Sequence, residues 1–536
     1  MKFLRNISEI TTYSFNPPSL LQNVLVLNLS FISKKNQALK PSHTLLPILL
    51  FLLATPLFAQ WNISSQTTLN GNRDDQLVGL LQLNGNFIGL GKSDSDYENN
   101  QGLYDFWLAK WDENLNVSWQ NSWGSPGEDI PKDFVSNGAG DLIVVGTTDS
   151  IGGNITSWQG NLDAWVIKVD KDGELLWQKS FGGSQNDVLE SIIAVEDGFV
   201  LAGYSESPEI LTDGQGEKDV WLVKIDEMGE MLWQKTLGSS EDDEGKDLLY
   251  LENGKMMLAA YIRTNDGDVT NHISSKDFWI TQLDQAGNIE NQWTFGGNKA
   301  DVPTVLVQVD NNHFAVAGET FSDFENSHGG GDTWVIQFDT SGTILQTNVI
   351  GGSSLDSPKD MIVNENQELI LVGETFSING DINTSYSTMN AFIGRINQAN
   401  DDHNIQVFGG NQFDSAWGII PLANDAYMIA GYTDSYDGDL AGKVAHGNHD
   451  AWIFVLDLFT DLPNISILPP FSLHEKMLHF HTQDIQQVSL YDLQGKTILQ
   501  QKNPTNFLDI GHLSTGIYII NLLIENKPFT AKIHLP

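Results

Sequence analysis

The residues best suited to chemistry are aspartates that recur after a glycine-rich turn. In seven places a Gly or Asn is followed five residues later by Asp, which gives the series Asp75, Asp129, Asp187, Asp243, Asp301, Asp356 and Asp414. Asp in a tight turn commonly accepts hydrogen bonds from backbone N–H groups, and this is the structural interpretation. The other interpretation is a ring of carboxylates that attracts a cation and whose mutual repulsion raises their pKa values.

A second group of acidic residues lies in long polar segments further along each repeat. Two Asp-Gly-Asp sequences supply Asp266 and Asp268, and Asp437 and Asp439. Hard cations such as Ca²⁺ prefer oxygen ligands, so these four residues are the candidate metal ligands. Neither segment has the spacing of an EF-hand loop, and solvated turns explain the same residues.

Sequence motifs for catalysis or cofactor binding do not stand out. Gly91-Lys92-Ser93 lacks the first Gly of a phosphate-binding loop, because position 86 is Asn. His474 and His479 are five residues apart, whereas two histidines on one face of a zinc-protease helix are four apart. We therefore predict no catalytic residue and no cofactor-binding residue.

The elements that carry the aspartates form seven copies of one unit. Besides the turn, each unit has an apolar run that ends in Gly (Ala260 once) and an Asp-x-aromatic sequence, as in Asp163–Trp165, with Asn390–Phe392 as a weakened copy. Successive units are offset by 54 to 58 residues, and each holds four runs rich in Val, Ile, Leu and Trp. Four short strands per repeat are the pattern of a β-propeller blade. The recurring Trp is predicted to pack in the core, because buried Trp supplies a large apolar area.

The two ends of the repeat region predict how the ring closes. The last unit stops after its third strand, at Asp457, and one strand, about Ile63–Leu69, precedes the first unit. Pairing these two strands would complete the last blade and remove an exposed sheet edge. The sequence thus predicts a seven-bladed propeller of four-stranded blades over residues 61–457, closed by an N-terminal strand. Around its channel mouth we expect the seven aspartates.

Charge and composition restrict the partners. The chain carries a formal charge of −41 and contains no Cys. A surface this acidic repels phosphate backbones, so nucleic acid is an unsuitable partner, and the fold depends on its core without disulfides. Residues 1–60 are interpreted as an extension and signal peptide, because Lys40 precedes an apolar run over 44–59 that is too short to span a membrane. No stable transmembrane segment is expected after its removal.

The C-terminal region differs from the repeats. Residues 458–470 form a Pro-containing linker, and residues 471–536 hold short strands that suit a small β-sandwich. The sequences VSLYDLQG (488–495) and LSTGIYI (513–519), with Lys532-Ile533, resemble the type A C-terminal sorting domain of the type IX secretion system. That resemblance implies a Gram-negative source, the secretion machinery as a partner, and a secreted or outer-membrane-surface location. The repeats are similar to bacterial β-propeller repeats, a group defined by fold that implies no particular activity.

Two functions follow as hypotheses. The first is a non-enzymatic, cell-surface or extracellular scaffold for binding or adhesion, which contacts a glycan or protein through the long loops of one face. The alternative is an extracellular polysaccharide hydrolase or lyase that uses acids at the channel mouth. A fold alone does not choose between them.

Overall fold

The computed structural model describes residues 61–535 apart from short gaps, at residues 70, 97–98, 212–215, 383, 385, 387, 398–402, 444–447, 459–470, 475–476, 481–484, 492–495, 503, 505–506, 512, 515 and 525–526. The predicted leader and nearly all of the predicted linker therefore lie outside the described residues. The described part is almost entirely β-structure, with two 3₁₀ turns, η1 (Ala423–Asp425) and η2 (Gly438–Leu440).

Seven four-stranded antiparallel sheets form the repeat region. Blades 1 to 3 consist of β2 (Asp75–Leu83), β3 (Asn86–Ser93), β4 (Asp105–Trp111) and β5 (Val117–Trp123); β6 (Asp129–Ser136), β7 (Leu142–Thr148), β8 (Asp163–Val169) and β9 (Leu175–Phe181); and β10 (Asp187–Val195), β11 (Gly198–Ser205), β12 (Asp219–Ile225) and β13 (Met231–Leu237).

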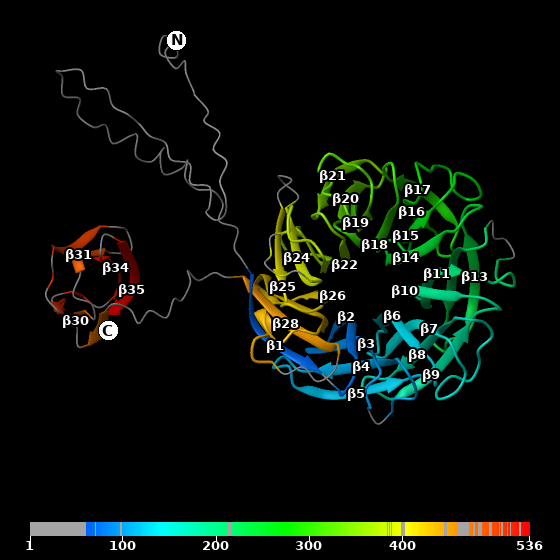
Figure 1. The fold of residues 1–536 in the computed structure, drawn as a ribbon, viewed down its shortest axis with the longest axis horizontal. Helices are drawn as coiled ribbons and strands as arrows, with labels where there is room; N and C mark the ends of the chain where they lie inside the picture. The colour runs from blue at the N-terminus through cyan, green and yellow to red at the C-terminus, as the bar shows by residue number, and fades with distance from the viewer. Residues whose placement is uncertain are drawn as a thin grey trace, which may run out of the picture. The chain divides into compact units, whose positions relative to one another are not determined.

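Blades 4 to 6 repeat this order. They consist of β14 (Glu244–Tyr250), β15 (Met256–Ile262), β16 (Asp277–Leu283) and β17 (Ile289–Phe295); β18 (Asp301–Gln308), β19 (His313–Thr320), β20 (Asp332–Asp339) and β21 (Ile344–Ile350); and β22 (Asp356–Val363), β23 (Leu369–Thr375), β24 (Asn390–Ile396) and β25 (His403–Phe408). The first strand of each blade is innermost, and it contacts the first strand of the blades on either side. Figure 1 shows these strands around a central axis.

The seventh blade closes the ring as predicted. It is built from β26 (Asp414–Pro421), β27 (Tyr427–Thr433) and β28 (Asp450–Leu458), and its outermost strand is β1 (Trp61–Leu69). β1 pairs antiparallel with β28 from Trp61↔Leu458 to Leu69↔Ala451 (Figure 1). β2 contacts both β6 and β26, so the first and last blades are neighbours.

The core lies between the blades. The Trp side chains of the Asp-x-Trp sequences are buried, with exposed fractions of 0 to 4%, at Trp107, Trp165, Trp221, Trp279, Trp334 and Trp452. They pack into clusters that draw residues from two adjacent sheets, as Trp165 does with Phe106 of the preceding blade, whose ring centroid is 4.5 Å away. These Trp residues therefore pack in the core, as predicted. Their large apolar rings are buried between adjacent sheets, and this burial stabilises the propeller.

The C-terminal region is a small β-sandwich of two sheets. One contains β29 (Phe471–His474), β30 (Met477–Phe480) and β33 (Phe507–Asp509), and the other β32 (Thr497–Lys502), β31 (Ile485–Tyr491), β34 (Gly516–Ile524) and β35 (Lys527–Leu535). One core cluster contains Leu478, Leu508, Val488 and Ile520, which come from the two sheets.

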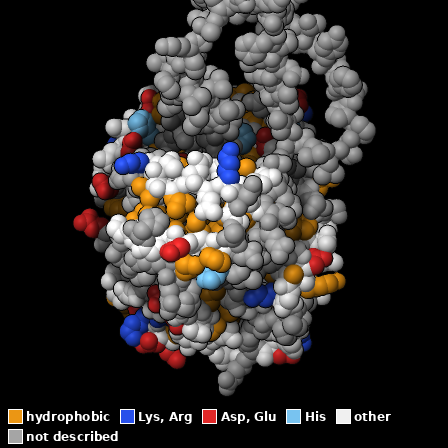
Figure 2. Space-filling view, turned by 90° about the vertical axis from the view of Figure 1, so that its left-hand side faces the viewer, with side chains coloured by type: hydrophobic (Ala, Val, Ile, Leu, Met, Phe, Trp, Pro, Cys, Tyr) orange, Lys and Arg blue, Asp and Glu red, His pale blue; other side chains and the backbone are white. Residues whose placement is uncertain are grey.

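Figure 2 shows exposed hydrophobic side chains beside acidic ones on the face that it presents. Among the described residues, no helix is long and apolar enough to cross a membrane.

Candidate functional site

One face of the propeller carries all the acidic candidates. Each blade begins its first strand, ends its second, begins its third and ends its fourth strand on this face, because consecutive strands are antiparallel. We call it the loop face. The long segments between second and third strands lie here, together with the glycine-rich turns that join one blade to the next.

The seven aspartates are buried inside this face. Each lies at or just before the start of an innermost strand and has an exposed fraction of 0 or 1%, so its carboxylate is enclosed. Every carboxylate accepts a hydrogen bond from the backbone N–H group four residues earlier, for example Gly71 to Asp75 at 2.6 Å and Gly352 to Asp356 at 2.7 Å. The carboxylates are buried because the turn that donates these hydrogen bonds covers them.

Hydroxyl groups from the second strand complete the shell around most of these carboxylates. In six blades the strand leads into a Ser/Thr-x-Ser sequence, and in five of these both hydroxyls donate to the Asp. In blade 1, Ser93 donates at 2.5 Å and Ser95 at 2.9 Å to Asp75. The same arrangement holds for Asp187, Asp301, Asp356 and Asp414. The carboxylates thus organise the loop face from inside.

A second acidic side chain lies beside six of them, and the amide of Asn390 lies beside Asp414. In the preceding blade, an Asp or Asn opens the third strand. The carbonyl of the residue just before it accepts the backbone N–H of the ring aspartate, at 2.6 to 3.0 Å in all seven cases. Pairs such as Asp105 and Asp129 are therefore held together across the blade junction. Burial raises the pKa of Asp105 to about 7 and that of Asp129 to about 6, and the Asp129 charge adds to the first shift.

Six of the seven turns have a glycine at the point where these paired side chains meet the turn. A Cβ at Gly351 would lie 2.2 Å from Asp332 Oδ1 and 2.7 Å from Asp356 Oδ2. Gly124 has the same neighbours, Asp105 and Asp129, at 2.2 and 2.6 Å. A side chain does not fit at these distances, so the repeated Gly allows close backbone approach.

The two Asp-Gly-Asp segments fasten their loops to the preceding turn. Asp439 accepts the Gly409 N–H at 2.9 Å and its own N–H donates to the Gly409 carbonyl, while Asp437 accepts the Asn411 N–H at 2.8 Å. Asp268 and Asp266 do the same for Gly238 and Ser240, at 3.1 and 2.8 Å.

The two carboxylates of each Asp-Gly-Asp pair therefore accept hydrogen bonds from different residues. In blade 2 the amide oxygen of Asn154 replaces the carboxylate and accepts the Gly124 N–H at 3.0 Å. Among the described residues, no group of three or more His, Asp or Glu side chains is arranged to hold a metal ion. Calcium binding at either pair stays a prediction.

Two rim positions at each blade junction were missed by the sequence analysis. One is the residue after the second strand of a blade, and the other precedes the ring aspartate of the next blade. Five junctions carry at least one charged residue, in the pairs Asp94/Glu128, Asp149/Asn186, Glu206/Asp242, Arg263/Ala300 and Asp434/Asp74. The other two are apolar, Phe321/Leu355 and Phe376/Phe413. Alignment of the repeats on the Ser/Thr-x-Ser sequence would have identified this change.

The apolar junctions form a continuous strip, which we call the apolar arc (Phe321, Leu355, Phe376 and Phe413). Phe321, Phe376 and Phe413 are 41, 40 and 46% exposed. A Cβ at Gly331 would lie 2.9 Å from both Phe321 Cε1 and Leu355 Cδ1, so both side chains lie against Gly331. The Phe376 N–H donates to the Leu355 carbonyl at 2.9 Å, which links the two junctions.

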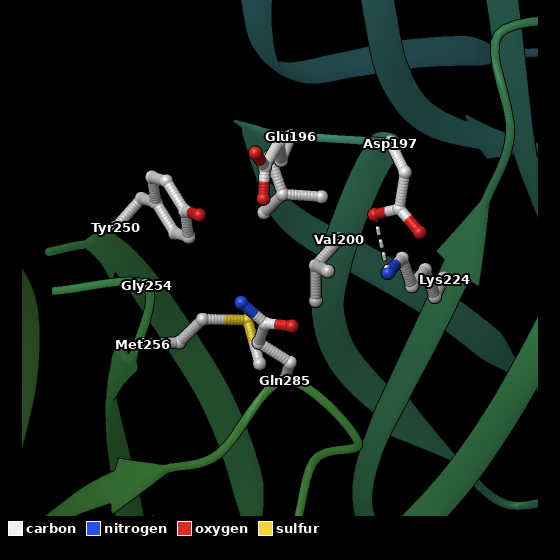
Figure 3. A pocket seen from close by; sticks show the side chains of 9 residues that line it. Glu196, Asp197, Val200, Lys224, Tyr250, Gly254, Met256 and Gln285 are labelled. Atoms are coloured by element: carbon white, nitrogen blue, oxygen red, sulfur yellow. Dashed lines mark ion pairs between the residues drawn. The ribbon is translucent and has the colours of Figure 1, made fainter. Parts of the chain in front are cut away.

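A small pocket lies on the opposite face, between blades 3 and 4. It has a volume of about 180 Å³ and is lined by Tyr250, Met256 and Gln285 together with Asp197 and Lys224 (Figure 3). Lys224 Nζ is 2.6 Å from Asp197 Oδ1, so its charges neutralise each other. This pocket is smaller than the clefts of several hundred Å³ that usually take ligands.

The comparisons with known proteins concern the two parts separately. Residues 474–535 match the family described as Secretion system C-terminal sorting domain. A curated relative, the regulatory protein FlaEY of Caulobacter vibrioides, is 28% identical over 222 residues, which are 37% of this chain and 23% of the relative. The chain thus matches less than a quarter of that relative's length.

Several solved structures are similar to the repeat region. The Pan2 WD40 domain of Neurospora crassa is 11% identical, with a TM-score of 0.42 and coverage of 75% of this chain and 96% of that one. The α-L-arabinanase of Penicillium chrysogenum is 12% identical (TM-score 0.38, 74% and 100% covered). The β-propeller domain of the Trilobed protease from Pyrococcus furiosus is 8% identical (TM-score 0.38, 74% and 99% covered).

Strand pairing and the C-terminal match together define the class: an exported, seven-bladed β-propeller. Its C-terminal part is a type IX secretion system sorting domain, so the protein is directed to the cell surface or the extracellular space and interacts with that machinery. The prediction from the sequence is confirmed on these points.

Proposed function

We propose that this propeller is a non-enzymatic binding protein that holds a polysaccharide outside the cell through the apolar arc of its loop face. The observation that carries the proposal is the exposure of Phe321, Phe376 and Phe413 at positions where most other junctions carry charges. Exposed apolar side chains gathered in one place usually mark an interaction site.

The surroundings of the arc favour a saccharide over a protein surface. The loops that carry Phe376 and Phe413 also hold the exposed polar residues Asn379 and Asn411, beside the exposed Ile378. Sugars present apolar C–H faces edged by hydroxyl groups, which suits isolated aromatic rings beside hydrogen-bonding side chains. A stable protein interface instead has a larger apolar centre from which charged residues are depleted.

The buried aspartates support binding without turnover. A general acid or base must reach the substrate, whereas the seven ring carboxylates are enclosed and bonded to their own turns. We therefore assign these seven to the scaffold, and a hydrolase or lyase would have to use other acids, such as the rim pairs Asp94/Glu128 and Glu206/Asp242.

The test measures binding of the full exported chain to a panel of neutral and acidic polysaccharides. Phe376→Ala and Phe413→Ala are each expected to weaken binding about tenfold, because each removes a stacking surface. Leu345→Ala is the matched control, since Leu345 is 53% exposed on β21, away from the arc. Equal loss in all three variants, or release of new sugar ends during incubation, would contradict the proposal.

A further inference from the structure

Four basic side chains gather on the loop face of blades 3 and 4. Lys218 and Lys276 precede the aspartates that open β12 and β16, Lys246 lies on β14, and Arg263 follows β15. We call Lys218, Lys246, Arg263 and Lys276 the basic cluster. Such a concentration of positive charge is unexpected in a chain with a formal charge of −41.

Two tyrosines lie within this cluster. Lys276 Nζ is 3.8 Å from the ring centroid of Tyr261, and Lys218 Nζ is 4.1 Å from that of Tyr204. Lys246 Nζ also lies near the Tyr261 ring, 5.8 Å from its centroid. Cation–π contacts of this kind hold the ammonium groups in place without neutralising them.

The carboxylates nearby do not balance every cation. Glu244 lies 2.9 Å from Lys218 and 2.6 Å from Lys246. Glu206 lies 3.4 Å from Lys218 and Asp242 lies 3.4 Å from Arg263, so three carboxylates face four cations. Lys276 has no ion pair within 4.0 Å among the described residues. Burial lowers the pKa of Lys276, and Arg263, Lys246 and Lys218 lower it further while Glu244 opposes them.

The basic cluster is continuous with the apolar arc. Lys276 forms a parallel bridge with Ala300, and the Lys276 carbonyl accepts the Asp301 N–H at 2.8 Å. The Ala300 carbonyl in turn accepts the N–H of Phe321, the first residue of the arc, at 2.9 Å. One ligand can therefore touch a cation and an exposed aromatic ring.

We infer that the basic cluster binds the carboxylate or sulfate group of an acidic polysaccharide whose sugar rings lie along the apolar arc. The inference rests on the proposed function and names the class of polysaccharide. Because the chain as a whole repels polyanions, binding of an acidic polymer requires a local positive site, and this cluster adjoins the aromatic rings. Ammonium groups recognise such anions through charge-assisted hydrogen bonds.

The experiment compares polygalacturonate with its carboxyl-reduced form, and chondroitin sulfate with its desulfated form, by calorimetry on the full exported chain. The wild type is expected to prefer at least one acidic polymer to its neutral counterpart. Lys276→Gln should lower that affinity about tenfold, whereas Lys276→Arg should retain it. Lys255→Gln is the matched control, because Lys255 pairs with Glu290 at 2.7 Å in the turn between β14 and β15 on the opposite face. A melting curve of each variant checks folding.

The outcomes separate this inference from the proposed function. Equal affinity for acidic and neutral polymers, with Lys276→Gln unchanged and Phe376→Ala still impaired, would overturn the basic cluster and leave the arc intact. Unimpaired binding by Phe376→Ala would reject the proposed function itself. Tighter binding of poly-glutamate than of either acidic polysaccharide would also overturn the inference, because the ligand would then be an acidic peptide.

Discussion

At each blade junction a buried aspartate pair, or Asn390 with Asp414, meets the α-carbon of a glycine-rich turn. The glycine leaves room for two side-chain oxygens, one from each blade, and the carboxylate of the later blade accepts an N–H from the turn. An acid that recurs in every repeat is thereby explained by packing and hydrogen bonding alone. The residues that we propose for binding lie where the repeats differ, at Phe321, Phe376, Phe413 and Lys276.

Gly351→Ala tests this explanation. The new methyl group would collide with Asp332 and Asp356, which are enclosed and have little room to move. We expect a loss of about 1–3 kcal/mol in the free energy of unfolding. Gly138→Ala serves as the control, because nothing lies within 4 Å of its added Cβ. Urea unfolding followed by Trp fluorescence gives both values, since all 15 Trp lie between residues 61 and 452. Matching stabilities would refute the packing argument.

At the scale of elements, β1 determines whether the ring is complete. Trp61 is buried in the core of the seventh blade, where its ring meets Tyr427 edge-on at 5.9 Å. Gln406 of β25 holds the Trp61 backbone from the neighbouring blade, accepting its N–H at 2.7 Å and donating to its carbonyl at 3.0 Å. β1 is thus fixed to two blades at once.

Trp61→Ala is expected to lower the free energy of unfolding by about 3–5 kcal/mol, because it empties a large buried site at the closure. Trp158→Ala, in an exposed segment of blade 2, should change it by less than about 1 kcal/mol. Denaturation midpoints of the two variants measured side by side decide the point. If Trp61→Ala were as stable as the wild type, closure by β1 would contribute little to the fold.

At the scale of the whole molecule, buried acids link stability to pH. On the innermost strands, Asp133, Asp247 and Asp360 accept backbone N–H groups from the next blade, those of Ile192, Leu306 and Ile419. Burial raises the pKa of Asp133 to about 6 and those of Asp247 and Asp360 to about 7. The folded protein therefore binds protons that the unfolded chain, with ordinary Asp pKa values, has already released.

The free energy of unfolding should accordingly fall as pH rises from 5 to 8. A group with a folded pKa near 7 contributes about 2 kcal/mol to this change, because stability falls wherever the folded state holds more protons. Asp360→Asn should flatten the profile, whereas Asp172→Asn, at an exposed turn, should leave its slope unchanged. Urea titrations at pH 5, 6, 7 and 8 provide the measurement, and a profile that rises with pH would show the opposite linkage.

Much of this architecture is predictable from the sequence, and the reasons are physical. Nearly every blade has the same turn glycine and buried Trp, so repetition marks seven blades, and the unpaired strand before Asp75 predicts the closure. The proposed binding surface breaks the repeat, and its residues are ordinary Phe and Lys. Whether Asp75 faces a channel or a turn depends on backbone hydrogen bonds that spacing does not specify.

The pairing of Trp61 with Leu458 also decides how the propeller is tethered. β1 begins, and β28 ends, on the side away from the loop face, so the chain enters and leaves the ring at one place on that side. The strand ends at Trp61 and Leu458 therefore lie on the face opposite Phe376 and the rest of the apolar arc.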